Sequence, residues 1–210
     1  MSVEIDGVNN VIKPDGSAMT IGASGDTITI PSGATITATA ATTTGFYAFA
    51  PMIDKWRVTT NLSTSDQEPI NANLERVDDS EELTGVAGNA LINAGMTQSS
   101  GIFTFPSTGK YYIKFAITFN STSDERYVGS FIQLTNDNST YRQTATAYSS
   151  VEDAHSSGTW GFNSCDTFVD ITNTTTDKVR FTVNAETTTT FYASSSRDYI
   201  TMTFIKMGDT

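Results

Sequence analysis

Residues 109–120, with the sequence GKYYIKFAITFN, decide the fold class of this chain. Successive side chains of an extended strand point to opposite faces, so every second residue shares a face. The face at odd-numbered positions carries only large apolar side chains, those of Tyr111, Ile113, Phe115, Ile117 and Phe119. The opposite face includes polar residues such as Lys114 and Thr118. This alternation predicts a β-strand with one buried face.

Further strand-like segments follow the first along the C-terminal half. The alternation is clear in residues 178–183 and 200–204 and less regular in residues 127–134, 141–148 and 162–172. Clusters of turn-forming residues separate these segments, and several strands at this spacing predict an all-β antiparallel sandwich. Residues 62–100 are polar, and there we expect a long surface excursion with one short strand near residues 74–77.

The composition excludes several classes of protein. The 210 residues include 12 Lys and Arg against 23 Asp and Glu, a net charge of −11 that argues against binding nucleic acid. No apolar run approaches the roughly 18 residues of a membrane-spanning helix, so we expect no membrane insertion. The N-terminus has neither the basic nor the apolar region of a secretion signal, so we expect assembly in a cytoplasm.

The first 45 residues differ from the rest, because they are rich in Thr and Ala and poor in large side chains. Most of their apolar area comes from Ile21, Ile28, Ile30 and Ile36. At about 25 cal/mol per Å² buried, four isoleucines cannot offset the ordering entropy of some forty residues. We therefore expect an extended β-rich arm over residues 1–45, ordered only against other chains, and a folded domain over residues 46–210.

Three segments resemble the C1q/TNF-like jelly-roll family. They are GIFTFPSTGKYYIKF at 101–115, TDKVRF at 176–181, and DYITMTFIK at 198–206. The resemblance implies an antiparallel jelly roll that forms a homotrimer through aromatic and aliphatic side chains. The aromatic residues in or near these segments are candidates for the core or the trimer contact, namely Phe103, Phe105, Tyr111, Phe115, Phe119, Tyr199 and Phe204.

A second resemblance links residues 3–46 to the opening, and residues 56–58, 73–77 and 95–109 to the following knob, of tail-fibre and other virion structural proteins of marine bacteriophages. It implies a trimeric short fibre or knob, anchored to capsid or tail proteins by residues 1–45 and exposed on the virion exterior. Contact with a host-surface glycan or protein is part of that hypothesis. The alternatives are a capsid decoration or cement protein without host binding, a glycan-cleaving fibre enzyme, and a secreted bacterial ligand of the C1q type.

Residues of catalytic type are sparse, and we expect no enzyme. His155 is the single histidine and lies in a polar run, and no Gly-x-Ser-x-Gly motif accompanies it. One histidine and one cysteine cannot build a typical zinc site, and Cys165 is expected to be a buried apolar group.

Two features remain as candidate binding residues. The acidic run that contains Asp78, Asp79, Glu81 and Glu82 is a candidate Ca²⁺ site, although a solvated acidic loop is favoured because its spacing is not that of an EF-hand. Trp160, expected in a loop beside glycines, is the candidate receptor contact, since an indole can stack on a sugar ring. No cofactor other than this cation is expected.

Overall fold

The computed structural model of the chain describes residues 52–78 and 91–210. Contacts between Cα atoms divide the chain into two units, residues 1–46 and 47–210. The predicted arm and its isoleucines Ile21, Ile28, Ile30 and Ile36 lie outside the described residues, and so do Asp79, Glu81 and Glu82 of the acidic run.

Strands are the regular elements of the described residues, which contain no α-helix and hence no helix that could cross a membrane. In chain order they are β1 (Met52–Val58), β2 (Leu62–Gln67), β3 (Leu74–Arg76), β4 (Leu91–Ile92), β5 (Thr97–Ser99), β6 (Ile102–Thr104), β7 (Gly109–Ser121), β8 (Glu125–Thr135), β9 (Arg142–Val151), β10 (Thr159–Ile171), β11 (Lys178–Phe191) and β12 (Thr201–Gly208).

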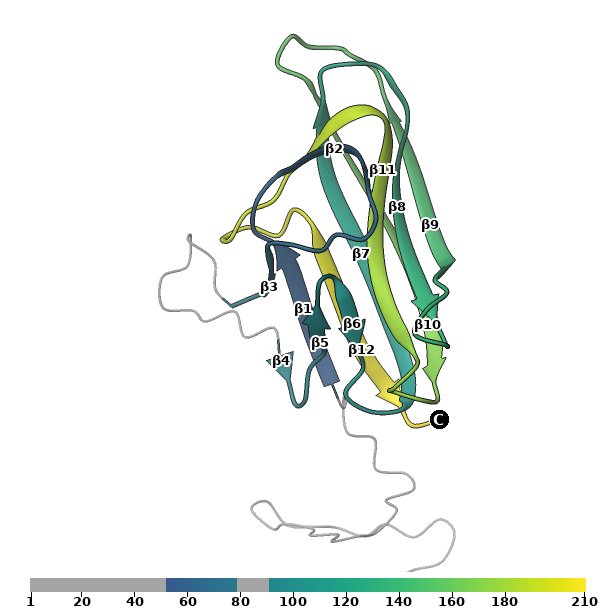
Figure 1. Ribbon diagram of the computed structural model, residues 1–210. Helices are drawn as coiled ribbons and strands as arrows, with labels where there is room; N and C mark the ends of the chain where they lie inside the picture. Colours follow the sequence, from purple (N-terminus) through teal and green to yellow (C-terminus); the bar gives the residue numbers. More distant parts are fainter. Residues whose placement is uncertain (1–51, 79–90) are drawn as a thin grey trace, which may run out of the picture. The chain divides into compact units, whose positions relative to one another are not determined.

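The strands form two antiparallel layers (Figure 1). The first layer has the order β3-β1-β12-β7-β10, with β4 beside β1. In the second layer β11 pairs with β2, β6 and β8, and β8 pairs with β9. A short pairing between β7 and the end of β11 joins the two layers. The predicted all-β antiparallel sandwich is confirmed.

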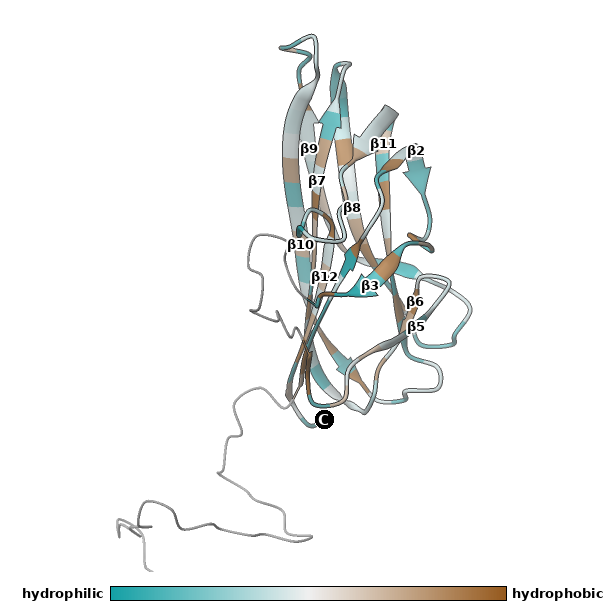
Figure 2. Cartoon of the chain, turned by 90° about the vertical axis from the view of Figure 1, so that its left-hand side faces the viewer, coloured by the Kyte–Doolittle hydropathy of each residue, from teal (hydrophilic) through white to brown (hydrophobic). Residues whose placement is uncertain are grey.

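The core lies between the layers and is rich in aromatic rings. The ring centroids of Phe115 in β7 and Phe181 in β11 are 5.1 Å apart, and Phe204 in β12 lies 5.8 Å from Phe181. All five apolar residues of the predicted buried face of β7 have no exposed surface. Figure 2 shows the result as apolar and polar bands that alternate along the long strands.

Residues 62–100 contain more regular structure than the expected surface excursion with one short strand. A short strand does lie near the predicted place, as β3, but β2, β4 and β5 also fall in this stretch. The segment buries Ile70 and Met96, which have 1% and no exposure. Short, polar strands at a sheet edge carry little apolar alternation, and their hydrogen bonds to β11, β1 and β6 order them instead.

One local prediction was wrong. Trp160 is the second residue of β10 rather than part of a loop. The neighbouring Gly161 also lies in β10 and does not mark a turn. A Cβ at this position would lie 2.3 Å from the Phe119 ring, so glycine is needed there for the close approach of the strand to that ring. The closing strand begins at Thr201, and Tyr199 lies half-buried in the bend before it. Of the two roles expected for Tyr199, the trimer contact therefore stays a prediction.

Candidate interaction face

An apolar row crosses the outward face of the first layer, opposite the core. Cross-strand pairing places Phe168 opposite Tyr112, Tyr112 opposite Ile205, and Ile205 opposite Ile53, which in turn faces Ile92. The neighbours of Tyr112 in the chain, Tyr111 and Ile113, point into the core, so Tyr112 points outward. Five strands thus contribute one apolar side chain each to a continuous row. We call these five residues the apolar row.

The two ends of the apolar row are open to solvent, and its middle residues Tyr112, Ile205 and Ile53 are half-buried. Phe168 is 70% exposed and Ile92 is 44% exposed, and the nearby Met207 of β12 is 58% exposed. The Phe168 ring lies 5.1 Å from the Tyr112 ring, and Phe168 and Met207 line a shallow, mainly apolar depression of about 360 Å³. A soluble monomer rarely exposes large apolar side chains so close together, which makes this face a candidate contact surface.

A second aromatic cluster lies towards the other end of the same face. Trp160 and Phe162 of β10 are 53% and 60% exposed and pair in register with Asn120 and Thr118 of β7. The Trp160 ring lies 4.1 Å from the Tyr192 ring, which is 6.1 Å from that of Tyr199. The candidate receptor contact Trp160 therefore belongs to an aromatic cluster and does not project alone.

Charged residues separate the two apolar regions. Lys114 of β7 stands opposite Asp166 of β10, and Lys55 of β1 forms an ion pair of 2.5 Å with Asp198. Burial raises the pKa of the Tyr112 hydroxyl, and the Asp166 carboxylate raises it further. The face thus combines apolar contact area with charges of both signs, a pattern typical of specific protein interfaces.

Asp78, the described member of the acidic run, is engaged in an ion pair. Its carboxylate accepts a 2.7 Å hydrogen bond from the buried guanidinium of Arg57, which also donates to Glu75 at 2.7 Å. Among the described residues, no group of three or more His, Cys, Asp or Glu side chains is placed to hold a metal ion. The structure therefore gives Asp78 a structural role at the end of β3.

The aromatic residues predicted for the core or the trimer contact fall into two sets. Six of them are at most 2% exposed and lie inside the domain, namely Phe103, Phe105, Tyr111, Phe115, Phe119 and Phe204. Tyr199 belongs to the second cluster. Sequence reasoning missed Phe162 and Phe168, although a signal was present. The even positions of β10 hold Trp160, Phe162 and Phe168, while the intervening odd positions start with small residues such as Gly161.

The single histidine and the single cysteine have local structural roles. His155 is exposed, and its Nδ1 atom lies 2.7 Å from Ser157 Oγ and accepts the Ser157 backbone N–H within the same turn. No carboxylate of the described residues hydrogen-bonds this imidazole. Cys165 is buried, which raises the pKa of its thiol, and it contacts Ser130 of β8. Within residues 52–78 and 91–210, no ion-pair or hydrogen-bond partner of the kind that activates a nucleophile lies against either residue.

Comparisons with known proteins identify the fold. No protein-family model and no curated protein matches the sequence. Among solved structures, Eiger TNF from S. frugiperda is 13% identical, with a TM-score of 0.50 over 76% of this chain and 95% of that chain. Murine APRIL at pH 5.0 is also 13% identical, with a TM-score of 0.49 over 74% of this chain and 98% of that chain. The likeness to Eiger confirms the predicted TNF-like jelly roll.

Proposed function

We propose that this chain is a non-enzymatic structural protein of a bacteriophage virion, and that its jelly roll associates into a homotrimeric knob. The observation that carries the trimer is the apolar row, with Phe168 and Ile92 exposed at its two ends. Each strand contributes one side chain, so the row forms a continuous apolar strip across the sheet that a second copy can cover. Rotation about a closed axis lets every subunit bury the same face.

Burial of the apolar row between subunits lowers the free energy relative to its exposure to water. Burial of a large apolar side chain gives roughly 1.5–3 kcal/mol relative to exposure, and the row and Met207 offer several such side chains per subunit. Aromatic residues also dominate the energetic centres of protein interfaces. The Lys55, Lys114 and Asp166 side chains beside the row would select the register in which opposite charges meet.

The virion role rests on the sequence resemblance of residues 3–46, 56–58, 73–77 and 95–109 to phage structural proteins. In this proposal residues 1–45 bind a capsid or tail protein, and the knob faces outward as a short head or tail fibre that contacts the host surface. A decoration protein that braces the shell and contacts no host is the second candidate. A glycan-cleaving enzyme is the less favoured candidate, because the two carboxylates that line the hollow at one end of the sandwich are both engaged, Asp170 by Lys110 and Asp177 by backbone N–H groups.

Light scattering of the purified full chain tests the trimer. The expected mass is three times the chain mass of 22.6 kDa at micromolar concentration. A stable monomer under these conditions would overturn the trimer proposal.

Virion incorporation tests the anchor. A phage that encodes a chain without residues 1–45 is expected to produce particles that lack the protein, while the full chain is incorporated. Incorporation of the shortened chain would show that residues 1–45 are not the anchor. Immunogold labelling of particles with the full chain would then distinguish a capsid location from a tail location, and labelling of neither would contradict the virion role.

A further inference from the structure

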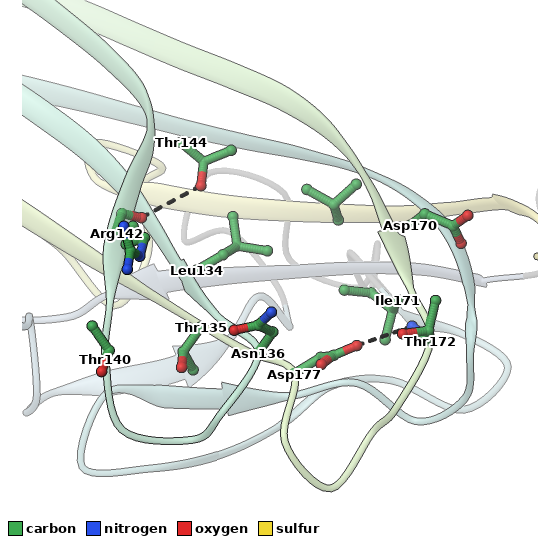
Figure 3. A pocket seen from close by; sticks show the side chains of 11 residues that line it. Leu134, Thr135, Asn136, Thr140, Arg142, Thr144, Asp170, Ile171, Thr172 and Asp177 are labelled. Atoms are coloured by element: carbon green, nitrogen blue, oxygen red, sulfur yellow. Dashed lines mark hydrogen bonds between the residues drawn. The ribbon is translucent and has the colours of Figure 1, made fainter.

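A hollow of about 560 Å³ opens at one end of the sandwich, where the β8–β9 and β10–β11 connections meet (Figure 3). Apolar side chains of Leu134, Val169 and Ile171 contribute to its lining. Around them lie polar residues of β9 and of the two connections, among them Asn136, Thr140, Arg142, Thr144, Thr172 and Asp177. The volume falls in the range of about 300–1,000 Å³ typical of small-molecule sites.

Hydrogen bonds fix both walls of the hollow. Asp137 accepts hydrogen bonds from the backbone N–H groups of Ser139 and Thr140 at 2.9 and 2.7 Å, which together with the Thr135 hydroxyl hold its pKa well below the ordinary value. On the other wall, Asp177 accepts hydrogen bonds from the N–H groups of Thr172 and Asn173, each at 2.9 Å. These bonds order the two connections without any ligand.

A direct bond also joins the walls. The backbone N–H of Asn138 donates to the carbonyl oxygen of Thr176 at 3.1 Å, and so links the β8–β9 connection to the β10–β11 connection. The hollow is therefore a preformed site, and a ligand would not have to meet the entropic cost of ordering its walls.

The acidic side chains that line the hollow have hydrogen-bond or ion-pair partners, whereas its arginine side chain has none in the part of the chain that the structure describes. Asp170 forms an ion pair with Lys110 at 2.9 Å, and Asp177 is occupied by backbone donors. Arg142 differs, because no hydrogen bond or ion pair joins its side chain to another of the described residues. Four other arginines each contact a carboxylate, namely Arg57, Arg76, Arg126 and Arg180. In a chain with a net charge of −11, an arginine that has no acidic partner and lines a hollow is available to a ligand.

We propose that this hollow binds a carboxylated sugar, with the ligand carboxylate on Arg142. A guanidinium matches a planar carboxylate with two parallel hydrogen bonds. The Asn136 amide and the Thr172 hydroxyl, which have no side-chain hydrogen bond within the described part of the chain, supply partners for sugar hydroxyls. Leu134 and Val169, which are only partly buried, offer apolar surface to the C–H face of the ring.

Two features select this ligand class over related ones. A phosphate ester carries close to two negative charges, and Asp170 and Asp177 in the lining would repel it more strongly than a singly charged carboxylate. A neutral sugar leaves the Arg142 guanidinium without a partner. Because Asp170 and Asp177 are both engaged, the site is built to hold a sugar and has no carboxylate available as a general acid.

Titration of the full chain with D-glucuronate and D-glucose, followed by NMR, tests the proposal. The two sugars differ only at C6, which is a carboxylate in glucuronate and a hydroxymethyl group in glucose. The comparison therefore isolates the contribution of the carboxylate that Arg142 is proposed to bind. We expect saturable binding of glucuronate, at least about tenfold tighter than that of glucose. Arg142→Gln is expected to reduce glucuronate binding to the level of glucose, and Arg142→Lys to retain part of it, since lysine keeps the charge but not the planar pair of donors.

Arg126→Gln is the matched control, because Arg126 is an exposed arginine at the opposite end of β8 that is already paired with Glu186. Its glucuronate affinity should equal that of the parent chain. Equal affinities for glucose and glucuronate, no saturation, or equal losses in the Arg126 and Arg142 variants would overturn the proposal. Competition by inorganic phosphate as strong as by glucuronate would also overturn it, because the site would then bind anions in general. The mass from light scattering is independent of all these outcomes, so the trimer proposal can stand or fall separately.

Discussion

The rings of Phe168 and Tyr112 contact one another across β10 and β7, with 5.1 Å between centroids, on the face of the sheet that points away from the core. Phe168 is 70% exposed, so the contact holds the ring in place without burying it. An exposed ring that is already fixed loses little conformational freedom when a partner covers it. The pair is therefore the part of the apolar row best prepared for association.

Phe168→Ser is expected to weaken self-association at least about tenfold, because interface aromatic residues commonly contribute more than 1 kcal/mol. Tyr148→Ser is the matched control, since Tyr148 is 60% exposed but lies on β9 in the other layer, where its ring contacts Phe131. Sedimentation equilibrium measures both variants. If the Phe168 variant and the parent chain have the same association constant, the contact surface lies on another face of the domain.

Gly95→Ala is expected to lower the free energy of unfolding by about 1–3 kcal/mol, the usual cost of overpacking. A Cβ at this position would lie 2.5 Å from Asp54 Oδ2 and 2.9 Å from Arg76 Nη2. It would disturb a buried carboxylate that accepts hydrogen bonds from Arg76, Trp56 and the backbone N–H of Met96.

Gly208→Ala provides the comparison for the Gly95 variant, because no heavy atom lies within 4 Å of its added Cβ. Denaturant unfolding should give the Gly208 variant a stability within about 0.5 kcal/mol of the parent. If the two variants lose the same stability, the close packing around Asp54 is not the cause.

Phe115→Asp is expected to prevent folding. Loss of the ring, which contacts Phe181, costs about 3–5 kcal/mol, and an unpaired buried carboxylate costs several more. The sum is comparable with the total stability of about 5–15 kcal/mol for a domain. Lys114→Ser changes the adjacent exposed position and should leave a folded protein by circular dichroism. A soluble, folded Phe115→Asp protein would contradict the register of β7.

Acidification is expected to destabilise the domain through Glu125. Burial alone would raise the pKa of this carboxyl, but hydrogen bonds from Thr187, Ser121 and Thr189 outweigh burial and lower the pKa below its ordinary 4.5. Because the pKa is lower in the folded state, the stabilisation is complete well above pH 4.5 and is lost as the pH falls through the folded-state value.

Glu125→Gln should therefore make the melting temperature less sensitive to pH below about 4.5, although it lowers the melting temperature at pH 7. Glu152→Gln serves as the control, since Glu152 is exposed and has no hydrogen bond to its side chain within the described part of the chain. Calorimetric melts between pH 3 and pH 7 measure both. An unchanged pH profile in the Glu125 variant would assign the acid sensitivity to other groups.

The strongly alternating segments were predictable, and the weakly alternating ones were not. β7 shows the clearest alternation, and the structure buries the face that the sequence indicates. β2 was missed because it is polar, and its pairing with β11 spans more than a hundred residues of sequence. The position of Trp160 was misjudged for a related reason, since glycines usually mark turns and Gly161 instead lies over Phe119.

The sequence by itself determined the strand periodicity and the division of β7 into a buried and an outward face, because these depend on residues close together in the chain. The TNF-like class of the jelly roll was predicted from the resemblance of three short segments to that family, and the structural likeness to Eiger confirmed it. Only the tertiary structure decided that Ile53, Ile205 and Phe168 form one row, and that Arg142 and Asp177 line one hollow. Strand register and the meeting of loops depend on pairing between distant segments. That pairing is set by packing of the whole core and leaves no periodic trace in the chain.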